Sequence, residues 1–372
     1  MRAPVEHIPG SNQHPTTLGR LRIVLADPSS FTPEYDHELA SSLARAGADV
    51  ELATSRFRFG ETIAPEGYRR NELFYPLSSR LFRRSRLRLP LKAIEHPLGL
   101  ARLHRRPADV VHVQWLAAPG IDARLLRSRA PLVFTAHDLL PRRTAGKVEL
   151  WRRLLERFDR VVVHSERGRE TLAGIGAVRD RLRVIPHPVF PSDPPRRDDG
   201  RTVLALGMIR PYKGLGDAIE AIKRTDDARL LVAGEPLEPV DGYRAAAGNR
   251  AEWRLRYLAA DEVDAALGES TLAVFPYRPE IDQSGALLRA LGAGVPVVAY
   301  DVAGLAEPVR RFDAGRVVPA GDIDGLAEAI TQLTGDPGAL AAAREGAERA
   351  RAELTWDAAA AAHLELYREL LP

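Results

Sequence analysis

The chain has 372 residues, no cysteine, 45% hydrophobic residues and a formal net charge of only +3. Its length exceeds the usual limit of about 250 to 300 residues for one hydrophobic core, so two domains are expected. The absence of cysteine excludes disulfide bonds and cysteine metal sites. No run approaches the roughly 20 apolar residues of a spanning helix, and residues 1–20 lack a signal-peptide core. We expect a flexible N-terminus over residues 1–20 and a cytoplasmic protein, at most peripheral to the inner membrane surface.

Short β-branched runs alternate with helical patterns in the first half of the chain, which is typical of a parallel sheet with crossover helices. The runs are Leu21–Ala26, Val50–Thr54, Val110–Trp115, Leu132–Ala136, Val161–His164 and Leu182–Ile185. We predict that they form the sheet of an N-terminal Rossmann-like domain over residues 21–187.

A basic segment with interleaved leucines occupies residues 80–106. Glu95 alone opposes its cations, which are Arg80, Arg83, Arg84, Arg86, Arg88, Lys92, Arg102, Arg105 and Arg106. The pattern suits contact with an anionic membrane surface or a polyanionic acceptor, although many charge runs are only solvated faces. Nucleic acid is not expected as a partner, because no binding module is recognisable and only 6% of the residues are aromatic.

Histidines follow two of the predicted strands. Ligands of open parallel sheets bind beyond the carboxyl ends of the strands. His137 is therefore a candidate for substrate contact, with packing at a turn as the alternative. His164 and Ser165 are candidates for polar contacts on the acceptor side, and Ser165 is equally well placed to cap the next helix.

A second set of strands follows a proline-rich linker over residues 188–200. These runs are Val203–Leu206, Leu230–Ala233, Arg254–Leu258, Leu272–Phe275, Val297–Tyr300 and Arg316–Pro319. We predict a second doubly wound sheet in a C-terminal domain over residues 201–355. Two such sheets would face each other across an interdomain cleft.

The loop after the first strand of this second set has the composition of a phosphate clamp. Only four of the 53 basic residues are lysines, and one of them, Lys213, stands three residues after Arg210 and between Gly207 and Gly214. A lysine point charge and an arginine fork can grip different oxygens of a diphosphate. A helix predicted over Leu215–Ile222 begins there. A solvated loop with two unrelated cations is the alternative.

Other strand ends in the second half add candidates for the same site. Glu235 follows the strand that ends at Ala233, although the sequence favours its interpretation as a turn residue. Ser284 can cap a helix whose first amides, around Gly285, point at an anion. Asp322 and Asp324 form a carboxylate pair, but they precede a helical pattern over Leu326–Leu333 and are better explained as caps.

These motifs together resemble the retaining glycosyltransferases of the GT-B fold, the large family numbered four. The resemblance is carried by the glycine, arginine, lysine and glycine of residues 207–214, by Phe-Pro-Tyr at 275–277 and by the block at 284–299. It implies that the second domain holds a sugar nucleotide, that the first meets the acceptor, and that a terminal helix over 356–372 packs back on the first domain. The implied donor-binding residues are Gly207, Arg210, Lys213, Gly214, Glu235, Asp282, Gln283, Ser284, Gly285, Ala286 and Arg289.

The resemblance also implies roles in catalysis. Arg210 and Lys213 would contact the donor diphosphate, and His137 would reach the donor sugar or stabilise charge near its anomeric carbon. The sequence departs from the family at two glutamates that usually lie near the sugar and the ribose, because Ile281 and Arg289 stand there. Asp282 or the amides around Ser284 are expected to replace the first glutamate, while ribose recognition stays unassigned.

The expected reaction is transfer of a sugar, with retention, from a nucleotide-diphosphate sugar to a glycan, lipid-linked or small-molecule hydroxyl. Neither a metal nor another cofactor is expected, because cationic side chains can neutralise the leaving group. A sugar-nucleotide epimerase and a non-catalytic sugar-nucleotide-binding protein are the alternatives.

Overall fold

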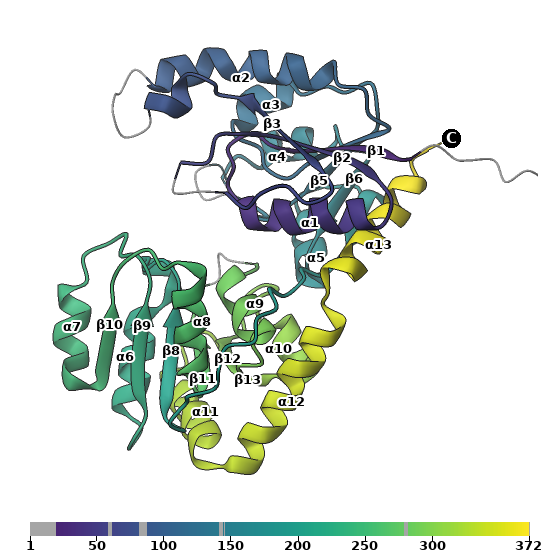
Figure 1. Cartoon of the computed structure of the whole chain (residues 1–372). Helices are drawn as coiled ribbons and strands as arrows, with labels where there is room; N and C mark the ends of the chain where they lie inside the picture. The colour runs from purple at the N-terminus through teal and green to yellow at the C-terminus, as the bar shows by residue number, and fades with distance from the viewer. Residues whose placement is uncertain are drawn as a thin grey trace, which may run out of the picture.

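The computed structural model describes residues 20–58, 62–81, 88–140, 144, 146–278 and 282–371. The chain forms two α/β domains that lie one above the other in Figure 1. Three cations of the predicted basic segment, Arg83, Arg84 and Arg86, lie outside the described residues, as does Ile281.

The N-terminal domain contains a seven-stranded sheet in the order β3-β2-β1-β4-β5-β6-β7, with every pair parallel. Its strands are β1 (Arg22–Asp27), β2 (Asp49–Ser55), β3 (Arg69–Phe74), β4 (Val110–Val113), β5 (Leu132–Thr135), β6 (Arg160–Val163) and β7 (Leu182–Val184). The helices of this half are α1 (Pro33–Arg45), α2 (Arg88–His104), α3 (Pro119–Leu125), α4 (Val148–Leu155) and α5 (Glu166–Gly174).

The C-terminal domain contains a six-stranded parallel sheet in the order β10-β9-β8-β11-β12-β13. Its strands are β8 (Thr202–Leu206), β9 (Arg229–Ala233), β10 (Ala251–Arg254), β11 (Leu272–Phe275), β12 (Val297–Tyr300) and β13 (Gly315–Val318). The helices are α6 (Leu215–Lys223), α7 (Asp241–Ala247), α8 (Ala260–Gly268), α9 (Gly285–Gly292), α10 (Glu307–Phe312) and α11 (Ile323–Gly335). Two doubly wound parallel sheets confirm the predicted fold class.

Two edge strands differ from the prediction. The strand predicted over Arg254–Leu258 is wrong, because β10 ends at Arg254, and β3 was not predicted at all. Both strands lie at a sheet edge and have few fully buried residues. An edge strand needs no continuous apolar run, because only one of its sides is paired and covered.

The C-terminal helices return the chain to the first domain. Helix α12 (Pro337–Glu353) packs beside α9 and α10, and α13 (Trp356–Arg368) continues upward to pack against α1, as Figure 1 shows. Trp356 and Tyr367 of α13 are buried in the same apolar cluster as Leu39 of α1. The Tyr367 hydroxyl lies 2.6 Å from Nδ1 of the buried His112. This helix therefore fastens the two domains together.

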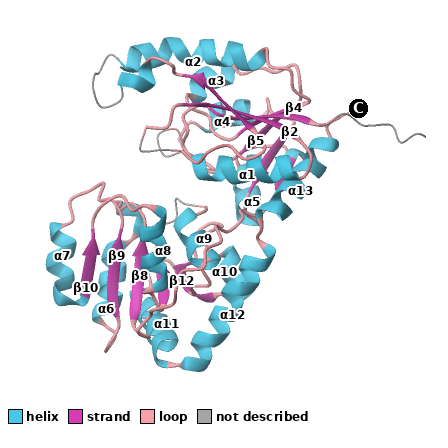
Figure 2. Ribbon diagram, in the orientation of Figure 1, coloured by secondary structure: helices cyan, strands magenta, loops and turns pink. Residues whose placement is uncertain are grey.

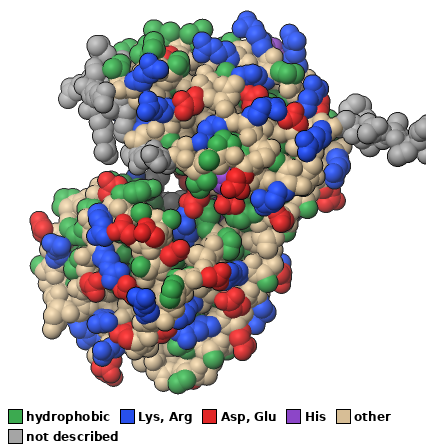
Figure 3. Space-filling view, in the orientation of Figure 1, with side chains coloured by type: hydrophobic (Ala, Val, Ile, Leu, Met, Phe, Trp, Pro, Cys, Tyr) green, Lys and Arg blue, Asp and Glu red, His purple; other side chains and the backbone are tan. Residues whose placement is uncertain are grey.

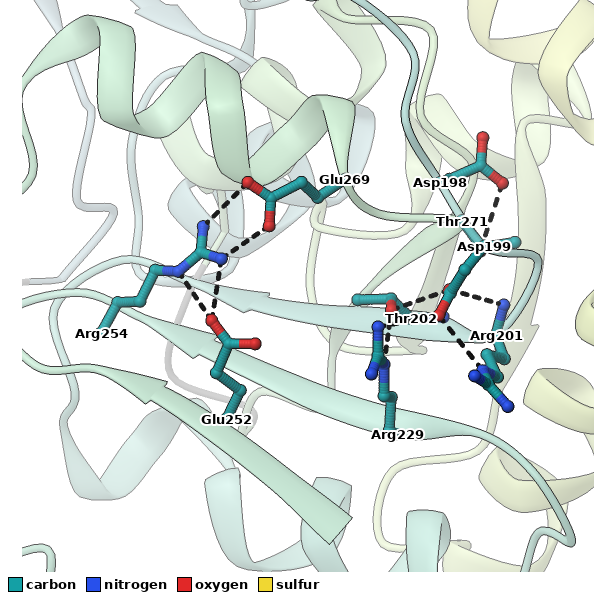
Figure 4. Close-up of polar contacts among 9 residues, drawn as sticks. All are labelled: Asp198, Asp199, Arg201, Thr202, Arg229, Glu252, Arg254, Glu269 and Thr271. Atoms are coloured by element: carbon teal, nitrogen blue, oxygen red, sulfur yellow. Dashed lines mark hydrogen bonds and ion pairs between the residues drawn. The ribbon is translucent and has the colours of Figure 1, made fainter.

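Polar contacts directly after the linker hold the amino-terminal ends of strands in the second sheet (Figure 4). The carboxylate of Asp199 accepts hydrogen bonds from Arg201 and Thr202 and pairs with Arg229 at 2.8 Å. Burial alone would raise the pKa of Asp199, but the hydrogen bonds and the charge of Arg229 lower it to about 2. These contacts fix the amino ends of β8 and β9. Figure 2 shows that β8, β9 and β10 then point toward the N-terminal domain.

Candidate active site

A glycine-bounded loop connects β8 to α6 and carries the predicted clamp. Gly207 and Gly214 have positive φ angles of 104° and 66°, which suit glycine. A side chain at Gly214 would overlap the carbonyl oxygen of Pro276, and one at Gly207 would place its Cβ 2.9 Å from Lys213 Nζ. The two glycines therefore allow the loop to approach the end of β11 and allow the Lys213 ammonium to lie against the backbone.

Lys213 lies in the wall of a small cavity of about 20 Å³ beneath this loop, which apolar side chains line for the most part, together with Gly207 and Tyr277. Its Nζ lies 4.9 Å from the centroid of the Tyr277 ring, a distance at which a cation and an aromatic face attract. Arg210 is exposed and does not line this cavity. Of the two predicted clamp residues, Lys213 therefore lies in the cavity wall and Arg210 lies at the surface.

Helix α9 begins beside this cavity, as predicted. Ser284 caps the helix by accepting a hydrogen bond from the amide of Leu287, and its hydroxyl lies 3.1 Å from the Tyr277 hydroxyl. Tyr277 therefore joins the cavity that Lys213 lines to the positive end of α9. The helix places Gly285 and Ala286 in its first turn, where backbone N–H groups have no partner within the helix.

Arg289, at one of the two departures from the family, and Asp282, next to the other, both contact the N-terminal domain. Arg289 forms an ion pair with Glu34 in the first turn of α1 and lies over the ring of Phe190. Asp282 is buried, and its Oδ1 accepts hydrogen bonds from the Ser165 hydroxyl at 2.7 Å and from the Gly304 amide at 2.9 Å. Burial raises the pKa of Asp282, although these two hydrogen bonds oppose the rise.

Asp282 therefore links the two domains in this structure and does not line the cavity beside Lys213. Its neighbour Gln283 is within 3.5 Å of the Gly304 carbonyl oxygen. Ser165 also caps α5 by accepting a hydrogen bond from the Gly168 amide, as the second of its two interpretations from the sequence predicted. Because Ser165 follows β6 and Asp282 precedes α9, the carboxyl edges of the two sheets meet here.

Glu235 has a backbone role. Its carbonyl oxygen accepts a hydrogen bond from the Ile209 amide at 2.9 Å, and Leu237 donates back to Ile209. The preceding Gly234 has a φ angle of 153°, and a side chain there would overlap Gly207. The segment from Gly234 to Leu237 therefore holds the clamp loop from the β9 side. The Glu235 side chain is half-buried.

His137 lies at the end of β5 in a group of aromatic rings. The imidazole stacks on Trp115 at a centroid distance of 5.1 Å and meets the edge of Tyr35 at 4.6 Å. Its Nε2 is 3.1 Å from Gln114 Oε1, and its Nδ1 is 3.4 Å from Nε2 of the buried His164. Both ring nitrogens of His137 thus have partners inside the N-terminal domain, and His164 contacts its Nδ1.

The tautomers of this group follow from its hydrogen bonds. Nδ1 of His164 donates to the Ile185 carbonyl oxygen at 2.9 Å, which leaves Nε2 as the acceptor for His137. His137 then carries its proton on Nδ1, and its Nε2 is a hydrogen-bond acceptor. The side-chain amide of Gln114 donates to this Nε2 when the amide is turned so that its nitrogen faces the ring. Burial lowers the pKa of His164 to about 4 and that of His137 well below its usual range, with neighbouring histidines adding to the effect on His137. Both effects favour the neutral form of His137.

The sequence of this chain matches known protein families. Residues 35–193 match the family described as Glycosyltransferase Family 4, and residues 200–336 match Glycosyl transferases group 1. The chain belongs to the group 1 glycosyltransferases of family 4. It is 28% identical over 252 residues to the D-rhamnosyltransferase WbpZ of Pseudomonas aeruginosa, a match that spans 61% of this chain and 65% of that protein. Less than two thirds of that relative is therefore covered.

Solved structures resemble this glycosyltransferase over nearly its whole length. Sucrose-phosphate synthase from Thermosynechococcus elongatus superposes with a TM-score of 0.72 at 21% identity, covering 94% of this chain and 99% of that one. HepE from Anabaena, in complex with UDP and glucose, gives a TM-score of 0.67 at 18% identity, covering 94% and 100%. At such identities these likenesses support the GT-B fold.

Sequence analysis gave no individual role to Tyr277, which it quoted only within a motif, and did not name Gln114 or Glu34. These residues acquire their roles through contacts with other segments of the chain. Apart from the motif at 275–277, their positions directly after a strand or in the first turn of a helix are the signal that the sequence holds. Asp322 caps α11 as predicted, by accepting from the Gly325 amide. Over the described ranges, no group of three or more histidine, aspartate or glutamate side chains is placed to hold a metal ion.

Proposed function

We propose that this glycosyltransferase moves a sugar, with retention, from a nucleotide-diphosphate sugar to a hydroxyl of a glycan, lipid-linked or small-molecule acceptor. The observation that carries the proposal is the position of Lys213, beside Gly207 and Tyr277 and next to the start of α9. This arrangement offers an ammonium group and helix amides to one diphosphate. The complex of HepE with UDP and glucose supports a sugar nucleotide as the donor.

The proposed chemistry needs no side-chain base. The bond between the anomeric carbon and the diphosphate oxygen breaks, and the acceptor oxygen bonds to that carbon on the same face. The proton of the acceptor hydroxyl passes to an oxygen of the leaving diphosphate. Lys213, the exposed Arg210 and the first amides of α9 stabilise the charge on that diphosphate more strongly as the bond lengthens. His137 contributes as a neutral, fixed dipole near the sugar.

Incubation with a panel of sugar nucleotides tests this proposal. Slow release of a nucleoside diphosphate, accelerated by a suitable acceptor and lost in Lys213→Ala, is the expected result. Conversion of the sugar nucleotide to an epimer without release would establish the epimerase instead. Tight binding with no turnover under any condition would make the protein a non-catalytic sugar-nucleotide binder.

We also propose that α2 brings the N-terminal domain to an anionic membrane surface. Leu89, Ile94 and Leu98 on this helix are 61%, 63% and 51% exposed, and Arg102 near its end is exposed as well. Figure 3 shows hydrophobic and basic side chains next to one another along the upper edge of the domain, where α2 lies. Within the described ranges, no helix has the length and apolarity to cross a bilayer.

Vesicle co-sedimentation tests the membrane contact. Wild-type protein should bind vesicles that contain phosphatidylglycerol at low salt and release them as salt rises. Ile94→Ser with Leu98→Ser should bind less, whereas the exposed Leu125→Ser on α3 serves as the control. Equal binding by both variants, or no binding by wild type, would show that the α2 surface is an ordinary solvated face.

A further inference from the structure

The N-terminal domain contains a second cavity that the donor chemistry does not use. It has a volume of about 180 Å³, and its lining comprises Arg58, Tyr75, Ser78, Ser79, Arg88, Leu89 and Lys92. Arg58 follows β2, Tyr75 follows β3, and Arg88 opens α2. Because a water molecule occupies about 30 Å³, the cavity has room for a phosphate group. Its described lining residues include three cations and no carboxylate.

Lys92 is held within this cavity by two neighbours. Its Nζ lies 3.3 Å from the Ser29 hydroxyl oxygen and 4.4 Å from the centroid of the Tyr75 ring. The Tyr75 hydroxyl is fixed in turn by a 2.7 Å hydrogen bond to His96. A lysine that lies over an aromatic face and is shielded from bulk water is a built feature, unlike the mobile lysines of protein surfaces.

The part of the cavity lining that contains Ser78 and Ser79 is also held in place. The carboxylate of Glu95 accepts hydrogen bonds from the amides of Leu77 and Ser78, at 2.8 and 3.0 Å. Ser78 and its neighbour Ser79 are buried and line the cavity. Hydroxyl donors and cations are the groups that bind phosphate oxygens. The one acidic residue of the basic segment therefore serves to hold this wall.

The electrostatics of the cavity favour an anion. Burial, together with the charges of Arg58 and Arg88, lowers the pKa of Lys92 to about 8. Burial and the charge of Arg88 likewise lower the pKa of Arg58. Asp27 and Asp122 oppose these effects on Lys92, but neither of them lines the cavity. Like charges that lie close together in a partly buried site are stabilised when an anion binds between them.

A line of contacts connects this cavity to His137. Ser29, which touches Lys92, belongs to the loop after β1, and the Thr32 hydroxyl of the same loop accepts a hydrogen bond from Trp115 Nε1 at 2.7 Å. Trp115 stacks on His137. All these groups follow β1, β4 or β5 at the carboxyl edge of one parallel sheet. A molecule anchored in the cavity can therefore extend along this edge toward the reaction centre.

We propose that the cavity formed by Arg58, Arg88, Lys92, Ser78 and Ser79 binds a phosphate group carried by the acceptor, so that the acceptor is a phosphorylated sugar or a phosphate-bearing lipid. This inference rests on the proposed glycosyl transfer, because it names the class of acceptor for that reaction. The cavity itself is tested without any transfer.

The four lysines of the chain provide the readout. In protein labelled with ¹³C-lysine, the methylene groups next to Nζ give one NMR signal each, assigned by Lys92→Gln, Lys147→Gln, Lys213→Gln and Lys223→Gln. Addition of inorganic phosphate or glucose 6-phosphate should move the Lys92 signal and raise the pKa of Lys92, while Lys147 and Lys223 stay unchanged. UDP should move the Lys213 signal. Vesicles of phosphatidic acid, compared with phosphatidylcholine, test the lipid source.

Matched variants identify the site. Lys92→Gln and Arg58→Gln should each weaken binding of glucose 6-phosphate or of phosphatidic acid vesicles by at least about tenfold, because each removes a charge-assisted hydrogen bond. Arg124→Gln, an exposed cation on the neighbouring helix α3, should bind as wild type does. A response to glucose 6-phosphate alone indicates a soluble acceptor, and a response to phosphatidic acid alone indicates a lipid; either supports the site.

Failure of the phosphate site and failure of the proposed transfer give different results. If neither probe moves the Lys92 signal while UDP still moves that of Lys213, the phosphate site is refuted and the donor site stands. If the Lys92 signal responds but no sugar nucleotide is ever turned over, the proposed transfer fails and only a phosphate-binding cavity remains.

Discussion

Replacement of Lys213 by alanine should cost more activity than any other single change on the donor side. The ammonium lies in the cavity wall, 4.9 Å from the centroid of Tyr277. Removal of one preorganised positive donor from a site of developing charge costs about 2 to 4 kcal/mol in the transition state. That corresponds to a fall of roughly 30- to 900-fold in kcat/KM. Lys213→Arg should be intermediate, because the charge is kept but the bulkier guanidinium has little room beside Gly207.

The assay is release of nucleoside diphosphate from the donor that the panel identifies, under conditions below saturation. Lys223→Ala is the matched control, since this lysine lies at the end of the same α6 region and pairs on the surface with Glu220 at 2.9 Å. Melting temperatures for both variants separate loss of activity from loss of folding. The reasoning is refuted if Lys213→Ala keeps wild-type kcat/KM, or if Lys223→Ala loses as much activity at equal stability.

The other predictions concern the charge, the interdomain contact and the buried histidines. Arg210→Ala should slow release of the diphosphate less than Lys213→Ala does, because Arg210 is exposed, and chelator treatment should leave wild-type activity nearly unchanged, since cationic groups face the leaving diphosphate. Gly304→Ala should loosen the interdomain contact and destabilise the protein by about 1 to 3 kcal/mol, because its methyl group would overlap Ser165 and Asp282; unchanged X-ray scattering and melting would argue against this role. The free energy of unfolding should fall as the pH drops from about 6.5 toward 4, by about 1.4 kcal/mol per pH unit for each buried histidine, since the unfolded chain takes up the proton while His164, with its pKa lowered to about 4, does not. His164→Asn should flatten this dependence, and an equally steep curve in that variant would exclude His164 as a source.

The sequence was most informative where the chain is apolar or rich in glycine. Buried central strands such as β11 and β12 are continuous apolar runs, and both were predicted to the residue. The glycines around Lys213 indicated a close backbone approach, which the overlap of a side chain at Gly214 with Pro276 explains. The caps by Ser284 and Asp322 were predictable because side-chain oxygens at helix starts act locally.

What the sequence could not provide depends on contacts across the fold. The edge strands β3 and β10 lack an apolar pattern, so one was missed and the other was misplaced by three residues at its start. The hydrogen bond that Asp282 accepts from Ser165, 117 positions away, has no local signal in the sequence. The basic segment was interpreted as one surface, whereas Lys92 turns into a cavity with Arg58 from another strand end. Such pairings arise from topology, which no local pattern encodes.

The stereochemistry of donor hydrolysis tests the central claim most directly. An α-linked sugar nucleotide that the enzyme turns over is followed by ¹H NMR, and the anomeric signals are recorded before mutarotation equilibrates the free sugar. The proposed same-face attack predicts that the α anomer and the nucleoside diphosphate appear together, at a rate that falls in Lys213→Ala. First appearance of the β anomer, or loss of the donor signal without release of the diphosphate, would contradict it.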